Sequence, residues 1–407
     1  MTLGAADEGV FDGDTLALWE PHIRAFVEIL PVATATREGV LSGLTFGVKD
    51  IIDVEGAHTR NGSATSVDVS LATKDAEVVA ALRAQGARVV GKTSTTEFAF
   101  TDPTDCRNPH DLSRTPGGSS SGSGAAVAAG LIDFALGTQT AGSLCRPAAY
   151  CGVVGFKPTY GALSRAGITP LAPSFDSVGV IAKSVTVAKS AFAVMDNQKT
   201  SPEGKLTTFV RWLLPGEVKA SSDTLSALDA ATKALALNAE ILPPPSMPCD
   251  PQAIVDAHRM VMLAEAFEAH GHIFRSDKAK LLRPKFRAAL DAGAGLNASD
   301  VSSARQTLRS AAEAFWSGMQ DVDAILTVPV PEGAPKLGEG TGFQDWLTPW
   351  TVFGGPLVSL PWGIDREGRP RAVMLAGRPG SDMPLLTLAQ QLEDSAPARP
   401  IPKHPPV

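Results

Sequence analysis

The stretch KDAEVVAALRAQGARVVGK, residues 74–92, constrains the fold more than any other part of this sequence. Three apolar residues share one face of a helix that Asp75 can cap, namely Val78, Val79 and Leu82. Gly86 suits the position that follows a helix, and Arg88–Val90 has the apolar character of a strand. A helix followed closely by a strand is typical of an α/β fold, which the sequence therefore predicts.

Other segments extend this pattern along the whole chain. We expect a helix over 14–30 and a short buried strand over Leu44–Val48 that ends at Lys49. A Gly/Ser loop over 112–124 precedes a small-residue helix and a strand over 132–138. The later predicted segments are a mostly helical middle over 220–320 with a break at Pro243–Pro248, strands within 323–376, and a Pro-rich, frayed tail over 396–407. We interpret residues 1–407 as a single domain.

Charge and composition exclude several classes of protein. The net charge is −7 and no Lys/Arg cluster occurs, so nucleic acids and anionic membranes are not expected partners. No apolar run approaches the length of a membrane span, and the acidic N-terminus lacks the pattern of a signal peptide. Four cysteines without a CxxC pair do not indicate a disulfide framework. A cytoplasmic protein is the resulting expectation.

Metal binding is not expected either. His270 and His272 flank Gly271 near the end of a helical stretch, but no obvious third ligand accompanies them. We therefore expect both side chains to be solvated at the surface.

Two segments rich in small polar residues, 112–124 and GTQTAGSLCRPAAYCG at 137–152, are either linkers or parts of a site built from exposed backbone. A phosphate-binding P-loop is excluded because neither glycine pattern continues to GK[ST]. GSSSG at 118–122 formally fits the nucleophile elbow around Ser120, but Pro116 and two glycines stand where that motif needs a strand.

Lys49 also has two interpretations. It is either a surface lysine paired with Asp50 or Asp53, or a partly desolvated general base. Its apolar neighbours on both sides suit the second interpretation, because burial lowers the pKa of a lysine.

Four motifs taken together are far more specific. They are GVKDIID at 47–53, GKTSTTEFA at 91–99, PGGSSSGS at 116–123 and TQTAGSLCRPAAYCGVVGFKPT at 138–159. This set resembles the amidase signature family, densely over 40–180 and loosely elsewhere, and the chain length is similar to that of its smaller malonamidase-like members. The resemblance implies an amidase signature fold, in which helices cover both faces of a large, twisted, mixed central β-sheet.

The resemblance also implies a Ser–cis-Ser–Lys triad without a metal or cofactor. Ser143 corresponds to the nucleophile, Ser119 to the bridging serine that follows a cis peptide bond, and Lys49 to the base. Four consecutive backbone N–H groups are then candidates for the oxyanion hole, those of Thr140, Ala141, Gly142 and Ser143. The small side chains of this segment would let a substrate carbonyl approach the backbone.

The substrate is less constrained. Candidate binding residues are Gly118, Arg146, Trp346 and Trp350. Arg146 has two equal interpretations: it either binds a carboxylate on the acyl group or has a structural role. Tryptophans at such spacing, here Trp346, Trp350 and Trp362, are more often core residues than pocket residues.

The chain departs from many family members at four positions. Gln139 and Ala141 replace Asp and Gly, and Ala372 and Met374 stand at the family's Gly and Gln positions. We treat these departures as questions about the substrate rather than about the reaction.

The expected function is hydrolysis of the C–N bond of a small amide through an acyl-enzyme. Carbamates (as for a urethanase), aryl amides and esters are further candidate substrates, and a homodimer stays open. One alternative is a protein like the A subunit of a tRNA-dependent amidotransferase, acting in a complex. A second alternative is a non-catalytic protein that binds anions with the same loops.

Overall fold

The computed structural model describes residues 13–31, 38–196, 204–213, 219–403 and 405. Their strands are β1 (Phe26–Ile29), β2 (Thr45–Lys49), β3 (Arg88–Thr93), β4 (Phe134–Gln139), β5 (Val154–Lys157), β6 (Ser177–Ala182), β7 (Thr208–Arg211), β8 (Glu240–Leu242), β9 (Ala324–Thr327), β10 (Leu357–Ile364) and β11 (Pro370–Gly377). These described strands form one sheet in the order β1-β3-β2-β4-β6-β5-β10-β11-β9-β7-β8, with parallel and antiparallel neighbours. The predicted large mixed sheet is confirmed.

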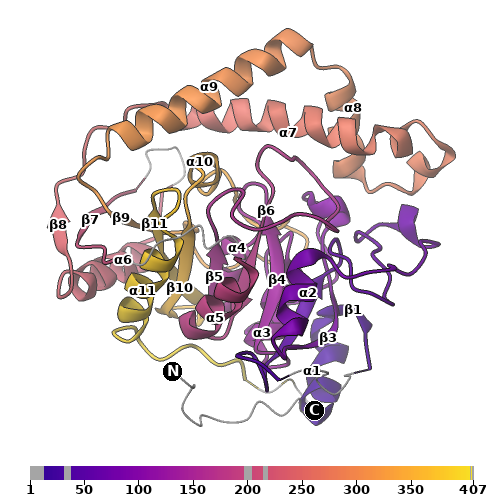
Figure 1. The fold of residues 1–407 in the computed structure, drawn as a ribbon, viewed down its shortest axis with the longest axis horizontal. Helices are drawn as coiled ribbons and strands as arrows, with labels where there is room; N and C mark the ends of the chain where they lie inside the picture. Colours follow the sequence, from indigo (N-terminus) through magenta and orange to yellow (C-terminus); the bar gives the residue numbers. More distant parts are fainter. Residues whose placement is uncertain (1–12, 32–37, 197–203, 214–218, 404, 406–407) are drawn as a thin grey trace.

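Helices flank this sheet (Figure 1). The α-helices are α1 (Gly13–Ile23), α2 (Glu77–Ala84), α3 (Ser121–Ala128), α4 (Cys145–Cys151), α5 (Val185–Met195), α6 (Ser222–Leu235), α7 (Pro251–Phe274), α8 (Pro284–Ala294), α9 (Ala298–Ser317), α10 (Thr348–Val352) and α11 (Asp382–Glu393). Short 3₁₀ turns occupy Ala64–Ser66, Glu97–Ala99 and Asp277–Leu281. Within the described ranges, no helix combines the length and apolar character needed to cross a membrane.

Three neighbouring strands create the edge that matters for function. Strand β2 pairs in parallel with both β3 and β4, with Val48 opposite Leu136 and Lys49 opposite Thr93. Parallel strands end at the same edge of a sheet, which is where open α/β sheets bind ligands. Lys49 at the end of β2 therefore lies beside the segment that follows β4.

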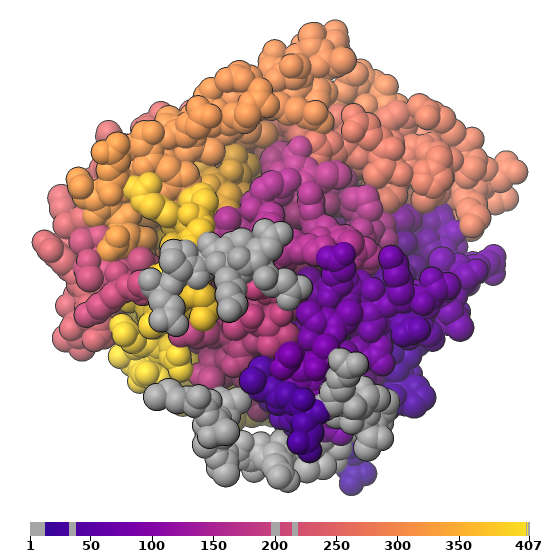
Figure 2. Space-filling view, in the orientation of Figure 1, coloured from indigo at the N-terminus to yellow at the C-terminus, as the bar shows by residue number. Residues whose placement is uncertain are grey.

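Two long helices, α7 and α9, and the shorter α8 lie beyond one end of the central strands. Figure 1 shows α7, α8 and α9 across the top of the view, and Figure 2 shows them as one continuous layer in salmon and orange. Helix α7 packs against both α8 and α9, and also against the short helix α10. The predicted helical stretch 220–320 contains α6 to α9.

Two local predictions were wrong near the N-terminus. The helix expected over 14–30 ends at Ile23, because the Glu20 carboxylate accepts the backbone N–H groups of Ala25 and Phe26 and the chain continues as β1. Asp75 does not cap α2. Its carboxylate instead accepts the N–H of Glu55 and pairs with Arg83 at 3.0 Å. The buried face of α2 and the positive φ of Gly86 agree with prediction.

The Gly/Ser segment is not a loop throughout, since α3 begins inside it at Ser121. Every residue of α3 is buried, and its small side chains allow the backbone to approach other segments closely. A Cβ on Gly122 would lie only 2.0 Å from the carbonyl oxygen of Ala25. This packing fixes the turn at residues 117–120 immediately before the helix.

Candidate active site

Lys49 and Ser119 are in direct contact. Lys49 Nζ donates hydrogen bonds to Ser119 Oγ and to Thr138 Oγ1, each at 2.7 Å, and all three residues are buried. Thr138 was not predicted as a site residue, although it lies in the motif at 138–159. The sequence does not indicate which side chain a threonine in a strand will contact. The three side chains come from β2, the turn before α3, and β4.

The electrostatic surroundings favour a neutral amine on Lys49. Burial lowers the pKa of Lys49 to about 7, and only the more distant Asp176 carboxylate opposes this shift. The carboxylates considered as partners are engaged elsewhere. Asp50 pairs with Lys92 at 3.5 Å, and Asp53 accepts the hydroxyl of Thr59. The surface-lysine interpretation is therefore wrong.

Ser119 lies in a tightly held turn. The Gly118–Ser119 peptide bond is cis, as the family resemblance implies. The carbonyl oxygen of Ser119 accepts the N–H groups of Thr96 at 3.2 Å and Ser121 at 2.9 Å. These backbone contacts keep the Ser119 hydroxyl directed at Lys49.

Arg146 holds the same turn from the other side. Its Nε and Nη2 both donate to the Gly118 carbonyl oxygen, at 3.1 and 2.6 Å, and Nη1 donates to the Gly342 carbonyl at 2.9 Å. The side chain is 1% exposed. These contacts fit the structural alternative for Arg146, while its predicted contact with a substrate carboxylate stays a prediction.

Ser143 lies between β4 and α4 and is the most accessible of the three triad candidates, at 7% exposure. Its carbonyl oxygen accepts the N–H of Ser120 at 3.2 Å, which brings its segment against the Ser119 turn. Among the described residues its Oγ makes no hydrogen bond, so the structure joins Lys49 to Ser119 but not Ser119 to Ser143. Catalytic hydrogen bonds often tighten only when substrate is bound.

The segment from Thr140 to Ser143 contains backbone donors without an acceptor among the described residues. Within the described ranges, the hydrogen bonds include no acceptor for the N–H groups of Thr140, Ala141, Gly142 and Ser143. Gly142 has no room for a side chain, because a Cβ there would lie 2.8 Å from Leu347 Cδ1. Consecutive free N–H groups in one segment are suited to bind a developing negative charge.

Gln139 shapes this segment from within the core. Its Oε1 accepts the N–H groups of Leu144 and Cys145 at 3.1 and 3.0 Å, and its Nε2 donates to Thr351 Oγ1 at 2.9 Å. Gln139 therefore caps α4 and fixes the loop that carries Ser143. The sequence suggested a question about substrate here, whereas the structure assigns Gln139 to the architecture of the loop.

A cavity of about 220 Å³ lies beside the Lys49 and Thr138 contact. Seven of its thirteen lining residues are apolar, and the polar ones are Thr138, Thr140, Arg165, Thr169, Asp176 and Ser177. Asp176 Oδ1 accepts the hydroxyl of Thr140 at 2.6 Å, and burial raises the pKa of this carboxyl. A cavity lined by apolar residues together with fixed polar groups is typical of small-molecule sites.

None of the four residues singled out as substrate contacts lines this cavity, namely Gly118, Arg146, Trp346 and Trp350. Trp350 is 1% exposed and packs edge-on against Phe315 and Phe353, as a core residue does. Trp346 and Trp362 are also buried. Substrate contacts of these tryptophans stay a prediction.

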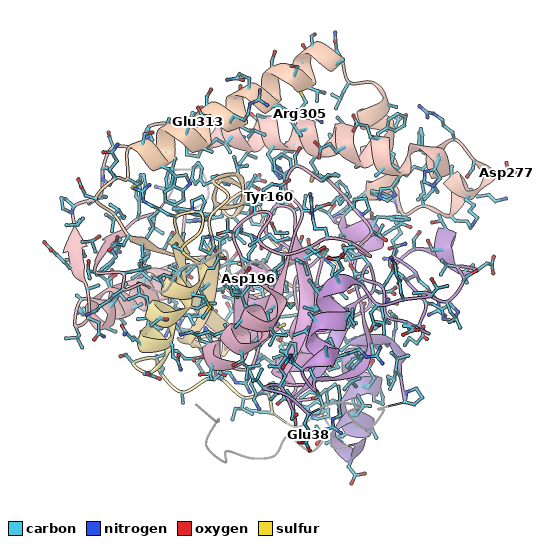
Figure 3. The ribbon with its side chains drawn as sticks, viewed as in Figure 1. Glu38, Tyr160, Asp196, Asp277, Arg305 and Glu313 are labelled. Carbon is cyan, nitrogen blue, oxygen red and sulfur yellow. The ribbon has the colours of Figure 1, made fainter. Side chains whose placement is uncertain are left out.

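Helix α7 carries three buried polar side chains that contact neighbouring segments, and of these only His258 contacts residues 140–143. His258 Nε2 lies 2.9 Å from the Thr140 carbonyl oxygen, and His270 Nε2 lies 2.7 Å from that of Pro170. Glu265 accepts the N–H and hydroxyl of Ser174 and pairs with Arg305 of α9, labelled in Figure 3, at 2.9 Å. The sequence singled out His270 only as a possible metal ligand, and no signal distinguished His258 or Glu265 from other residues on a long helix.

The histidine prediction is partly wrong. His272 is exposed, but His270 is buried and packs against the rings of Phe98 and Phe286. The part of the chain that the structure describes contains no cluster of His, Cys, Asp or Glu able to hold a metal ion.

Comparisons with known proteins identify the family and the fold of this chain. Residues 30–212 match the Amidase family. The chain is similar to the A subunit of glutamyl-tRNA(Gln) amidotransferase from Koribacter versatilis (strain Ellin345), with 31% identity over 407 residues that cover 87% of this chain and 84% of that protein. It is also similar to a crystal structure described as an amidase, with TM-score 0.82, 28% identity and 94% of each chain covered. The native peptide amidase of Stenotrophomonas maltophilia gives a TM-score of 0.80 and 26% identity over 96% of this chain and 93% of that one.

Proposed function

This chain belongs to the amidase family, and from that premise we propose that it cleaves the C–N bond of a small amide through an acyl-enzyme on Ser143. The observation that carries this proposal is the 2.7 Å hydrogen bond between Lys49 Nζ and Ser119 Oγ in a buried site. A buried lysine with a pKa of about 7 is available as a neutral base near neutral pH.

The proposed reaction begins with proton transfer. Neutral Lys49 accepts the proton of Ser119 Oγ while Ser119 accepts that of Ser143, and Ser143 Oγ attacks the amide carbonyl carbon. The tetrahedral intermediate collapses when the nitrogen receives a proton from Ser119, which regains one from the Lys49 ammonium. The free amine leaves, and water then hydrolyses the Ser143 ester by the same relay.

The carbonyl oxygen becomes negatively charged in this intermediate. The N–H groups of residues 140–143 are free to stabilise it, because none of them has an acceptor among the described residues. Losing one such donor typically costs about 10²–10³ in kcat.

The cavity beside Thr138 and Thr140 combines apolar and polar lining residues, which suits a small substrate group with both characters. Carbamates, aryl amides and esters have carbonyl groups open to the same attack. The test is a screen of amides, carbamates and esters with the wild-type chain and with Ser143→Ala. Turnover by the wild type alone supports the proposal. Ligand binding without turnover of any compound supports the non-catalytic anion-binding alternative instead.

A second candidate is a component of a larger complex, as the name of the relative from Koribacter versatilis indicates for that protein. This alternative predicts weak activity of the isolated chain and co-purification with a partner. The first proposal predicts full turnover by the isolated chain, whether it is a monomer or a homodimer. Size-exclusion chromatography followed by assays of each fraction distinguishes them.

A further inference from the structure

We infer that His258 and Thr351 are positioning residues that aim the N–H groups of Ala141 and Gly142 at the reacting carbonyl oxygen. This inference rests on the proposed function, because it concerns the oxyanion hole of that reaction. Both side chains lie far from the catalytic motifs in sequence, on α7 and next to the end of α10.

His258 contacts the carbonyl of Thr140 and is 2% exposed. Because a carbonyl oxygen only accepts, His258 Nε2 must carry the hydrogen and donate it over 2.9 Å. The imidazole ring also packs on Phe175, with ring centroids 4.3 Å apart. The ring is therefore held in one orientation by a hydrogen bond and by packing.

Thr351 contacts the next carbonyl in the chain. Its Oγ1 donates to the Ala141 carbonyl oxygen at 2.6 Å and accepts the side-chain N–H of Gln139 at 2.9 Å. The hydroxyl hydrogen is thereby committed to Ala141.

A trans peptide group is planar, and its C=O and N–H bonds point in opposite directions. A donor fixed on the Thr140 carbonyl therefore turns the Ala141 N–H away from α7. The Thr351 hydroxyl, bound to the Ala141 carbonyl, likewise turns the Gly142 N–H away from α10. Helices α7 and α10 pack against each other, so both donors lie on one side of the segment. The Arg146 N–H fixes the third carbonyl, that of Gly142, at 3.0 Å. Three successive peptide groups are thus oriented by donors bound to their carbonyl oxygens.

The experiment measures the second-order rate constant for labelling of Ser143 by a fluorophosphonate. The phosphoryl oxygen of this probe occupies the position of the substrate carbonyl oxygen, so the natural substrate need not be known. His258→Phe keeps the ring that packs on Phe175 but removes the donor. We expect labelling to slow about ten- to a hundredfold, less than the loss of a direct donor. His258→Gln, which can place an N–H near the same point, should recover most of the rate.

His270 provides a matched control on the same helix. It is 4% exposed, its Nε2 contacts a backbone carbonyl, and it packs on Phe98 with centroids 4.4 Å apart. His270→Phe removes an equivalent hydrogen bond away from residues 140–143. It should lower the melting temperature as much as His258→Phe while the labelling rate changes less than threefold.

Thr351→Val gives an independent test if His258→Phe does not fold. Its control is Thr348→Val, because Thr348 is equally buried on α10 but donates to the Gln344 carbonyl at 3.2 Å. Thr351→Val should slow labelling at least tenfold, Thr351→Ser should restore it, and Thr348→Val should leave it within threefold.

The outcomes separate the two proposals. Ser143-dependent labelling of the wild type, together with unchanged rates in His258→Phe or Thr351→Val, overturns the positioning roles alone. Equal slowing in the His270 and Thr348 controls also overturns them, because the effect would then be one of stability. Wild-type labelling that persists in Ser143→Ala overturns the proposed function itself, and the inference with it.

Discussion

Gln139 and Thr351 are joined by a hydrogen bond of 2.9 Å although 212 residues separate them. The same glutamine side chain accepts two N–H groups at the start of α4. One side chain thus connects the loop of Ser143 to α10, and through Thr351 to the Ala141 carbonyl. This long-range connection therefore helps to fix the shape of the loop that carries Ser143.

Replacing Gln139 with leucine should destabilise the protein. The N–H groups of Leu144 and Cys145 would be buried without an acceptor, at a cost of about 1–3 kcal/mol each. Urea unfolding measures the change, and Gln139→Glu, which keeps an accepting oxygen, serves as the comparison. A free energy of unfolding unchanged in Gln139→Leu would show that the cap contributes nothing.

Ser143→Ala should lower hydrolysis by about four to six orders of magnitude, because the nucleophile is lost while the surrounding backbone stays in place. Mass spectrometry of the fluorophosphonate-treated protein should find no adduct. Ser123→Ala, which removes another buried serine of the Gly/Ser motif, is the control. Retained turnover in Ser143→Ala would remove this residue from the mechanism.

Activity should rise with pH through a value of about 7. The base is active only when neutral, and burial lowers the pKa of Lys49 to about that value. A plot of kcat/KM against pH from 5 to 9 should therefore show an ascending limb centred near 7 and a plateau above it. The expectation fails if the rate is flat across this range or falls as the pH rises.

Arg146→Ala should reduce turnover of neutral and carboxylate-bearing substrates by the same factor, because its donors are engaged with the carbonyls of Gly118 and Gly342. The comparison needs KM and kcat for a matched pair of amides that differ only in the carboxylate. A KM increase confined to the anionic amide would instead support substrate binding by Arg146.

Lys49 should destabilise the fold at low pH. Its pKa falls from 10.5 to about 7 on folding, so the unfolded chain binds more protons and wild-type stability rises with pH between these values. The slope contributed is about 1.4 kcal/mol per pH unit. Lys49→Met removes this pH-dependent contribution. The stability advantage of Lys49→Met over the wild type should therefore be greatest below pH 7 and decline toward pH 10.

Chemical denaturation at pH 6, 8 and 10 measures this difference between Lys49→Met and the wild type. Lys233→Met, at an exposed position on α6, is the control and should leave the pH dependence unchanged. A pH-independent difference for Lys49→Met would mean that the lysine is protonated in the folded protein throughout.

Short sequence patterns correctly predicted the elements whose structure depends on residues close together in the chain. The apolar face of α2 and the strand that ends at Lys49 carry short-range signals. The pairing of Lys49 with Ser119 was instead implied by the family resemblance, and the structure places the two side chains in contact. The wrong prediction for Asp75 has a non-local cause. Asp75 has the chemistry of a cap, but the distant N–H of Glu55 competes for its carboxylate.

The supporting contacts could not be predicted for the same reason. His258 and Thr140 are 118 residues apart, and a histidine on a long helix carries no mark of its partner. Gln139 was noticed only as a departure from a family pattern, because its three hydrogen bonds become visible only once β4, α4 and α10 are brought together.

Helix α7 lies at residues 251–274, outside the segment 30–212 that matches the Amidase family. The proposed reacting groups lie inside that segment, whereas His258 reaches them from outside it. The proposed positioning role of His258 predicts that substitutions in α7 change turnover while every reacting group is kept. A directed-evolution library aimed at rate should include α7 and α10 alongside the cavity, because a search confined to the signature motifs would miss these positions.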